Sequence, residues 1–258
     1  MSLAPLTATR LEKAAADNGF DRPRGAHGDW LAFGSNHAPL RVWLGVAKAG
    51  QPVVALSRMD VDRALGALGT TTTVGLPPGA AAARMTPGFD VLHELLRRAY
   101  QLARTLPDEL LHVFEEKTKA LPRATEAERL VVQRVGQDVF RAGLMEYWEG
   151  RCAVTGLTVP ELLRASHIKP WAACGTDAER LDVYNGLLLA PHLDAAFDAG
   201  FITVADDGEI LVSPHLSVPD RRWLGLDARL RVGRLAPEHR TYLTWHRLKE
   251  FRRAEANR

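Results

Sequence analysis

One continuous stretch, residues 164–198, constrains the fold more than any other part of the chain. It reads RASHIKPWAACGTDAERLDVYNGLLLAPHLDAAFD. A short apolar segment is closed by Pro170, and an Asn-Gly turn at Asn185 leads into a second apolar run, LLLAP, which continues with helical periodicity. Together with the apolar RCAVTGL that precedes it, at residues 151–157, the pattern predicts two short strands followed by a helix.

Four polar residues are concentrated in this otherwise Leu- and Ala-rich stretch: His167, Asn185, His192 and Asp194. An imidazole has an unperturbed pKa near 6.5 and suits proton abstraction at neutral pH. A carboxylate suits a hard divalent ion. The cluster therefore predicts either a metal-assisted active site or a small core in which these groups satisfy one another.

The first part of the chain, residues 1–105, predicts a small α+β domain without a motif that carries chemistry. The expected helices cover residues 8–18, 58–69 and 89–106, and the expected strands cover 29–35, 40–47 and 51–57. The Thr-, Pro-, Gly- and Ala-rich segment 70–88 is typical of a loop. This organisation is that of an α+β protein.

The polar segment 106–124 is interpreted as an interdomain linker, because it carries Pro107 and Pro122 and little apolar periodicity. After it, Thr125 followed three residues later by Glu128 is a capping-box pattern. It predicts a helix that runs to Gly150. The second domain is thus expected to span residues 125–258.

Composition excludes several protein classes. The chain of 258 residues holds only two cysteines, which argues against a structural zinc knuckle and against a disulfide scaffold. The chain contains no run of about 18 apolar residues, so no membrane span is predicted. The N-terminus lacks the pattern of a secretory signal, so a cytoplasmic location is expected.

Charge is unevenly distributed, although the net charge is only +2. Lys and Arg outnumber Asp and Glu by 12 to 8 in residues 1–105 and by 11 to 4 in residues 221–258, whereas residues 106–220 hold 10 against 19. Basic segments attract phosphate backbones and an acidic middle suits metal ligation. A solvated surface of mixed charge explains the same counts.

Taken as an ordered set, SHIKPW, NGLLL and LDAAFD, with the lead-in RVGQDVFRAGLMEYWEGRCAVTG, resemble the HNH endonuclease family. The resemblance covers roughly residues 125–250 and is closest to a bacterial subgroup that is often found as restriction enzymes. It implies a C-terminal ββα-metal nuclease domain with surrounding helices. It also implies hydrolysis of double-stranded DNA with one divalent ion, Mg²⁺ or Mn²⁺.

The resemblance also implies residue roles. His167 occupies the general-base position, and Asn185 that of the asparagine that orients the base, although Asn-Gly is also a turn signal. The final metal ligand of the family falls nine residues after Asn185, at Asp194, with His192 as a second candidate. Ser166 stands where many members carry an acidic residue or His, so the metal ligands here are fewer and would be completed by water or phosphate oxygens.

Expected DNA contacts come from basic residues near the base and in the C-terminal tail: Arg164, Lys169, Arg252 and Arg253. Residues 1–105 would select the DNA, as in restriction of foreign or methylated DNA, and a homodimer would help to cut both strands. Two alternatives remain open: a DNA-binding protein with a degenerate site, and an effector nuclease whose first domain senses a ligand or a partner protein.

Overall fold

The computed structural model describes residues 3–47, 49–72 and 75–253. The chain divides into two compact units, Met1–Leu106 and Pro107–Arg258. Both combine helices and antiparallel strands, so the predicted α+β class is confirmed.

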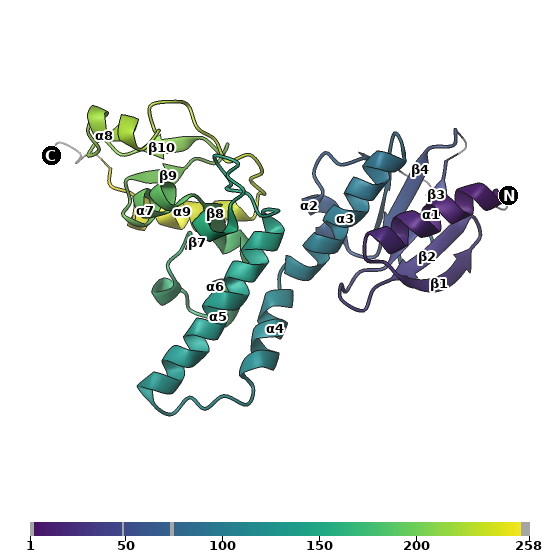
Figure 1. Ribbon diagram of the computed structural model, residues 1–258, viewed down its shortest axis with the longest axis horizontal. Helices are drawn as coiled ribbons and strands as arrows, with labels where there is room; N and C mark the ends of the chain where they lie inside the picture. Colours follow the sequence, from purple (N-terminus) through teal and green to yellow (C-terminus); the bar gives the residue numbers. More distant parts are fainter. Residues whose placement is uncertain (1–2, 48, 73–74, 254–258) are drawn as a thin grey trace. The chain divides into compact units, whose positions relative to one another are not determined.

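The first unit is built on a six-stranded sheet in the order β1-β2-β3-β4-β6-β5, in which all pairs are antiparallel. Figure 1 shows α1 and α3 lying against one face of this sheet. In chain order its elements are α1 (Pro5–Asp17), β1 (Arg22–His27), β2 (Trp30–Gly34), β3 (Val42–Val46), β4 (Pro52–Leu56), α2 (Met59–Ala64), β5 (Thr70–Thr71), β6 (Ala82–Met85) and α3 (Phe89–Thr105).

The central strands β3 and β4 are buried on both faces. Val42 is paired with Leu56 and Leu44 with Val54, so these four apolar side chains share a face. All four are buried, as are the apolar residues of α3 that recur at helical spacing. This layer forms one part of the core of the first unit, and on the opposite face of the sheet Trp43, Val53 and Ala55 belong to a second buried cluster.

The segment 70–88 differs from its expectation, because it is not mostly loop: β5 and β6 complete the sheet there. Alanine-rich β6 has little intrinsic preference for a strand. A buried ion pair fixes it, since Arg84 Nε lies 2.7 Å from Asp62 Oδ1 and the same guanidinium donates to the carbonyls of Gly66 and Leu68. Tertiary contacts that a local pattern does not reveal thus decide this strand.

The second unit places helices around two short sheets, β7–β8 and β9–β10. In chain order its elements are α4 (Glu109–Thr118), α5 (Glu126–Tyr147), η1 (Pro160–Leu162), β7 (Arg164–His167), η2 (Trp171–Ala173), α6 (Asp177–Leu181), η3 (Val183–Asn185), β8 (Gly186–Leu189), α7 (Pro191–Asp198), β9 (Ile202–Val204), β10 (Ile210–Val212), α8 (Val218–Trp223) and α9 (His239–Lys249).

The segment 106–124, expected to be a linker, is largely a helix of the second unit. Figure 1 shows α4 running beside α5, and the Leu110 side chain occupies the space above Gly143, where a Cβ would overlap it. The capping box at the start of α5 is present in both directions, since Thr125 Oγ1 accepts from Glu128 N and the Glu128 carboxylate accepts from Thr125 N.

The strand–strand–helix core of the second unit consists of β7, β8 and α7. The two strands are antiparallel, with His167 opposite Gly186. The first predicted strand, RCAVTGL, is instead a turn, in which the Gly156 amide donates to the Cys152 carbonyl. One amide of this turn, Ala153 N, donates to the Leu188 carbonyl of β8, but the strand pair itself is formed by the next two segments.

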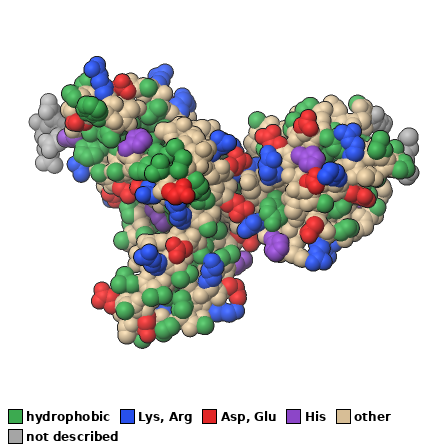
Figure 2. All heavy atoms as spheres, in the orientation of Figure 1, with side chains coloured by type: hydrophobic (Ala, Val, Ile, Leu, Met, Phe, Trp, Pro, Cys, Tyr) green, Lys and Arg blue, Asp and Glu red, His purple; other side chains and the backbone are tan. Residues whose placement is uncertain are grey.

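The surface of the second unit carries both signs of charge. On the face drawn in Figure 2, basic and acidic side chains alternate without a large area of one sign. The C-terminal helix α9 ends at Lys249, residues 250–253 beyond it are not helical, and the rest of the tail lies outside the described residues. No helix in the described part of the chain is both long and apolar enough to cross a membrane.

Candidate functional site

His167 ends β7 with its ring held in one orientation. Its Nε2 lies 2.8 Å from the carbonyl oxygen of Arg180. Because a carbonyl only accepts, Nε2 carries the proton of the neutral ring and donates it. Nδ1 is left as an acceptor and makes no hydrogen bond to another described residue.

Aromatic rings enclose the same imidazole. Phe140 of α5 stacks on it, with centroids 3.7 Å apart and an interplanar angle of 14°, and Trp171 meets it edge-on at 5.6 Å. This burial lowers the pKa of His167 to about 4, and the Arg180 carbonyl only partly offsets it. The ring is therefore neutral at neutral pH, the state that a general base requires.

Asn185 is fully buried and joins the ends of the loop that follows His167. Its Oδ1 accepts from Lys169 N at 2.8 Å, while its Nδ2 donates to Lys169 O at 3.2 Å and to Glu179 O at 3.0 Å. The side chain thus ties the backbone two residues after His167 to the segment that carries the Arg180 carbonyl. It also stands in the turn into β8, as the Asn-Gly pair indicates.

Two carboxylates, Asp194 and Asp198, lie one turn apart on α7 and therefore share a face of the helix. The buried Ser166 hydroxyl donates to Asp198 Oδ1 at 3.2 Å and lowers the pKa of Asp194. Burial nevertheless raises the pKa of both carboxyls, and for Asp198 the charge of Asp194 adds to the rise. Protein atoms around the Asp198 carboxyl group displace water from it, although the residue as a whole is exposed.

His192, the second candidate ligand, is exposed and forms no hydrogen bond to a described residue. It lies two residues from Asp194 on α7 and so projects about 200° away from it around the helix. The structure therefore brings Asp194, Asp198 and Ser166 together and leaves His192 apart from them.

A hard divalent ion fits the donor set of Asp194, Asp198 and the Ser166 hydroxyl. Two carboxylates whose pKa values are raised, one of them by the other's charge, are a pair that a cation would stabilise. Among the described residues no group of three or more His, Cys, Asp and Glu could hold a metal. Water and phosphate oxygens would have to complete the coordination.

His167 and one of the two carboxylates, Asp198, line a single cavity of about 360 Å³. Its walls include Ser166, His167, Asp198 and His246. His246 packs flat on Phe197 with ring centroids 3.9 Å apart, and its ring nitrogens contact Thr203 Oγ1 and Phe197 O.

The four basic residues expected to contact DNA have different surroundings. Arg164 is exposed next to the carboxylates and its charge lowers the pKa of Asp194. Arg252 lies over the Phe201 ring at 4.4 Å, and Arg253 is exposed. Lys169 differs from them, because its ammonium is paired with Glu179 inside the protein.

Sequence reasoning missed three contributors to the site: Phe140, Glu179 and Arg180. Asp198 was not among the predicted ligands, although its i, i+4 spacing from Asp194 already places both carboxylates on one face. The glycine at position 186 is the sequence feature that relates to the close approach of Phe140, because a Cβ there would lie 2.6 Å from the Phe140 ring. The backbone carbonyl of Arg180 has no signal in the sequence.

Comparison with known protein families gives a match in one part of the chain. Residues 152–205 match a family model described as HNH endonuclease. The match covers β7, β8 and α7, and with them every residue of the base and carboxylate cluster except Phe140. A search of curated proteins found no match.

Proposed function

We propose that this protein is a metal-dependent DNA endonuclease with His167 as the general base and Asp194 and Asp198 as the metal ligands. The observation that carries the proposal is that a neutral histidine with a bare Nδ1 and an acidic residue line the same cavity. The HNH endonuclease domain at residues 152–205 supports DNA as the substrate.

In the proposed reaction, His167 Nδ1 takes a proton from a water molecule whose oxygen attacks the scissile phosphorus, the bond from phosphorus to the leaving oxygen breaks, and that oxygen takes up a proton from solvent. The Arg180 carbonyl accepts a hydrogen bond from Nε2–H throughout, so it favours the imidazolium that forms. Asn185 holds Lys169 and Glu179 in place beside the base. A bound divalent ion would neutralise charge on the phosphate and stabilise the leaving oxygen.

The test is nicking of a supercoiled plasmid in Mg²⁺ or Mn²⁺. His167→Ala should lower the rate roughly 100- to 10,000-fold, because base catalysis is lost. His192→Ala on the exposed side of α7 is the matched control and should nick like the wild type. Equal rates for the wild type and His167→Ala would reject the nuclease.

A second candidate, a DNA-binding protein with a degenerate site, is favoured by one observation: the described residues offer only two carboxylates and a serine to the metal. Under this alternative, the protein binds a DNA duplex and its His167→Ala variant shows the same residual nicking.

The finer part of the proposal is a cytoplasmic restriction role, with the first unit reading the DNA and a homodimer cutting both strands. The alternative is an effector nuclease whose first unit senses a ligand or a partner protein. Cleavage of plasmids from hosts with different methylation separates them. A methylation-dependent rate supports the restriction role, and a rate indifferent to the source of the plasmid favours the sensor.

A further inference from the structure

The acceptor of the His167 proton belongs to a helix that needs outside support. Arg180 O lies near the end of α6, which has only five residues, and so short a helix is not stable alone. Glu179 O, the preceding carbonyl, accepts from Asn185 Nδ2. Two backbone carbonyls at the end of α6 thus accept hydrogen bonds, one from the His167 side chain and one from the Asn185 side chain.

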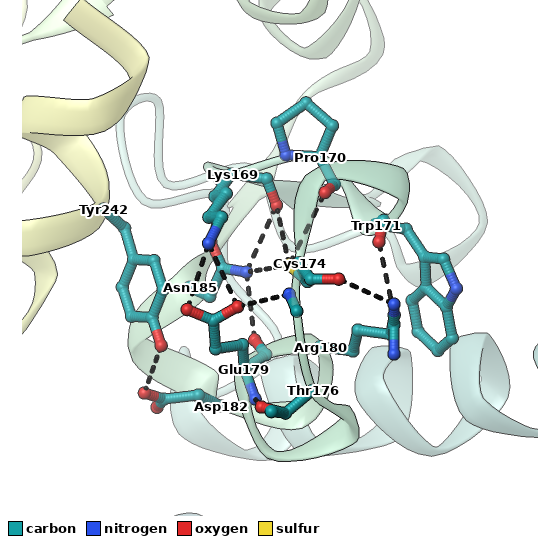
Figure 3. A network of polar contacts seen from close by, with 11 residues as sticks. Lys169, Pro170, Trp171, Cys174, Thr176, Glu179, Arg180, Asp182, Asn185 and Tyr242 are labelled. Carbon is teal, nitrogen blue, oxygen red and sulfur yellow. Dashed lines mark hydrogen bonds and ion pairs between the residues drawn. The ribbon is translucent and has the colours of Figure 1, made fainter.

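An ion pair closes the loop between the base and this helix (Figure 3). Lys169 Nζ lies 3.0 Å from both Oε1 and Oε2 of Glu179. Lys169 stands two residues after His167, and Glu179 immediately precedes Arg180. The pair therefore joins the two segments whose separation sets the length of the His167–Arg180 hydrogen bond.

The same carboxylate organises the loop between them. Glu179 Oε2 also accepts from Gly175 N at 2.7 Å, and these contacts lower the pKa of Glu179. The Lys169 side chain is only 17% exposed and that of Glu179 35%. A partly shielded, bidentate pair is ordered more firmly than an exposed one.

We infer that Lys169 and Glu179 are positioning residues for the base: their ion pair holds the Arg180 carbonyl where it fixes the His167 tautomer. The inference rests on the proposed nuclease function and deepens it. It also gives the Lys169 ammonium a role inside the protein instead of on the DNA phosphates.

The test variants are Glu179→Gln and Lys169→Met, each of which breaks the ion pair. Two controls accompany them: Lys169→Arg keeps the positive charge, and Glu116→Gln removes an exposed carboxylate of α4 that is paired with Lys119. The first readout is the ¹⁵N NMR spectrum of the histidine rings in the full chain, with His167 assigned through His167→Gln. The second is kcat and KM for plasmid nicking.

Glu179→Gln and Lys169→Met should convert the single His167 tautomer into a mixture and lower kcat about 10- to 100-fold, with KM within about twofold. Lys169→Arg should restore the single tautomer, and Glu116→Gln should match the wild type. An unchanged His167 spectrum in both variants overturns the inference, as does a rise in KM with kcat unchanged, which would return Lys169 to DNA binding. A wild type that does not nick would refute the nuclease proposal alone, because the NMR comparison still decides the positioning role.

Discussion

Asp194 and Asp198 illustrate how two residues can be held ready for a cation. Each carboxyl has a raised pKa, so each negative charge is disfavoured by the folded protein on its own. Ser166 offers a hydroxyl to the pair instead of a third charge. The site would therefore bind its ion with less protein charge and depend more on the phosphate of the substrate.

Asp198→Asn tests whether this second carboxylate is a ligand. It should weaken Mn²⁺ binding at least about tenfold, because even residues that only support ligands have effects of that size. Without metal the variant should be more heat-stable than the wild type at pH 7, since a charge disfavoured by folding is gone. Calorimetric titration and thermal unfolding measure both, with His192→Asn as the control. Unaltered Mn²⁺ affinity would leave Asp198 with a structural role only.

His239 makes stability depend on pH. It is fully buried with Nε2 unpartnered, and burial lowers its pKa to about 4. The unfolded chain takes up a proton nearer pH 6.5, so this contribution is complete above pH 6.5 and is lost as pH falls toward 4, by at most about 3 kcal/mol. Urea unfolding from pH 7 to pH 4.5 should show a shallower decline for His239→Leu. Parallel curves would contradict the assignment.

At the residue scale, the sequence singles out polar side chains but not the groups that support them. The family resemblance pointed to His167 and Asn185, and the spacing of nine residues from Asn185 favoured Asp194 over His192. The stacking ring of Phe140 and the carbonyl of Arg180 were not foreseen. Both depend on how distant segments meet, and a backbone carbonyl has no residue type at all.

At the scale of elements, the contact between α5 and β8 sets the base in place. Gly186 stands opposite His167 in the strand pair, and the absence of its side chain lets Phe140 and Leu144 approach. A Cβ at this position would lie 2.6 Å from the Phe140 ring and 2.7 Å from Leu144 Cδ1. Close packing of a helix on the strand thus positions the ring that stacks on the imidazole.

Gly186→Ala should destabilise the protein by about 1–3 kcal/mol, because overpacking forces neighbouring side chains or backbone to move. Nicking should fall more than stability alone explains, since Phe140 must shift from the His167 ring. Gly233→Ala is the matched control, as its Cβ would meet nothing nearer than 3.9 Å. Chemical unfolding and nicking rates, measured well below the melting temperature, decide the case. Equal effects of the two substitutions would rule out this packing role.

Elements with strong periodicity were predictable and those decided by contacts were not. The helix at residues 89–106 and the three hairpin strands of the first unit lie close to their expected positions, because their apolar patterns and their tertiary environment agree. Helix α4 was taken for a linker, since two prolines flank a polar sequence. Of its four apolar side chains, Leu110 and Phe114 are buried, whereas Val113 is exposed.

At the scale of the whole molecule, the chain consists of two units with separate cores. The base, the carboxylates, the supporting loop and the helix behind them all lie within Pro107–Arg258. The six-stranded sheet closes with its own helices within Met1–Leu106. Dividing the chain between Leu106 and Pro107 would therefore separate the residues of the proposed reaction from the first unit and from any recognition that it provides.

A fragment of residues 107–258 should fold and nick plasmid DNA at a rate within about tenfold of the full chain, because no atom of the proposed reaction lies outside it. If the first unit selects the DNA, the fragment should lose any preference among plasmids of different methylation that the full chain shows. The full chain should unfold in two calorimetric transitions, one reproduced by the fragment 107–258 and the other by a fragment of residues 1–106. His167→Ala within the fragment is the control. A fragment that unfolds cooperatively but does not nick would show that the first unit contributes to catalysis itself.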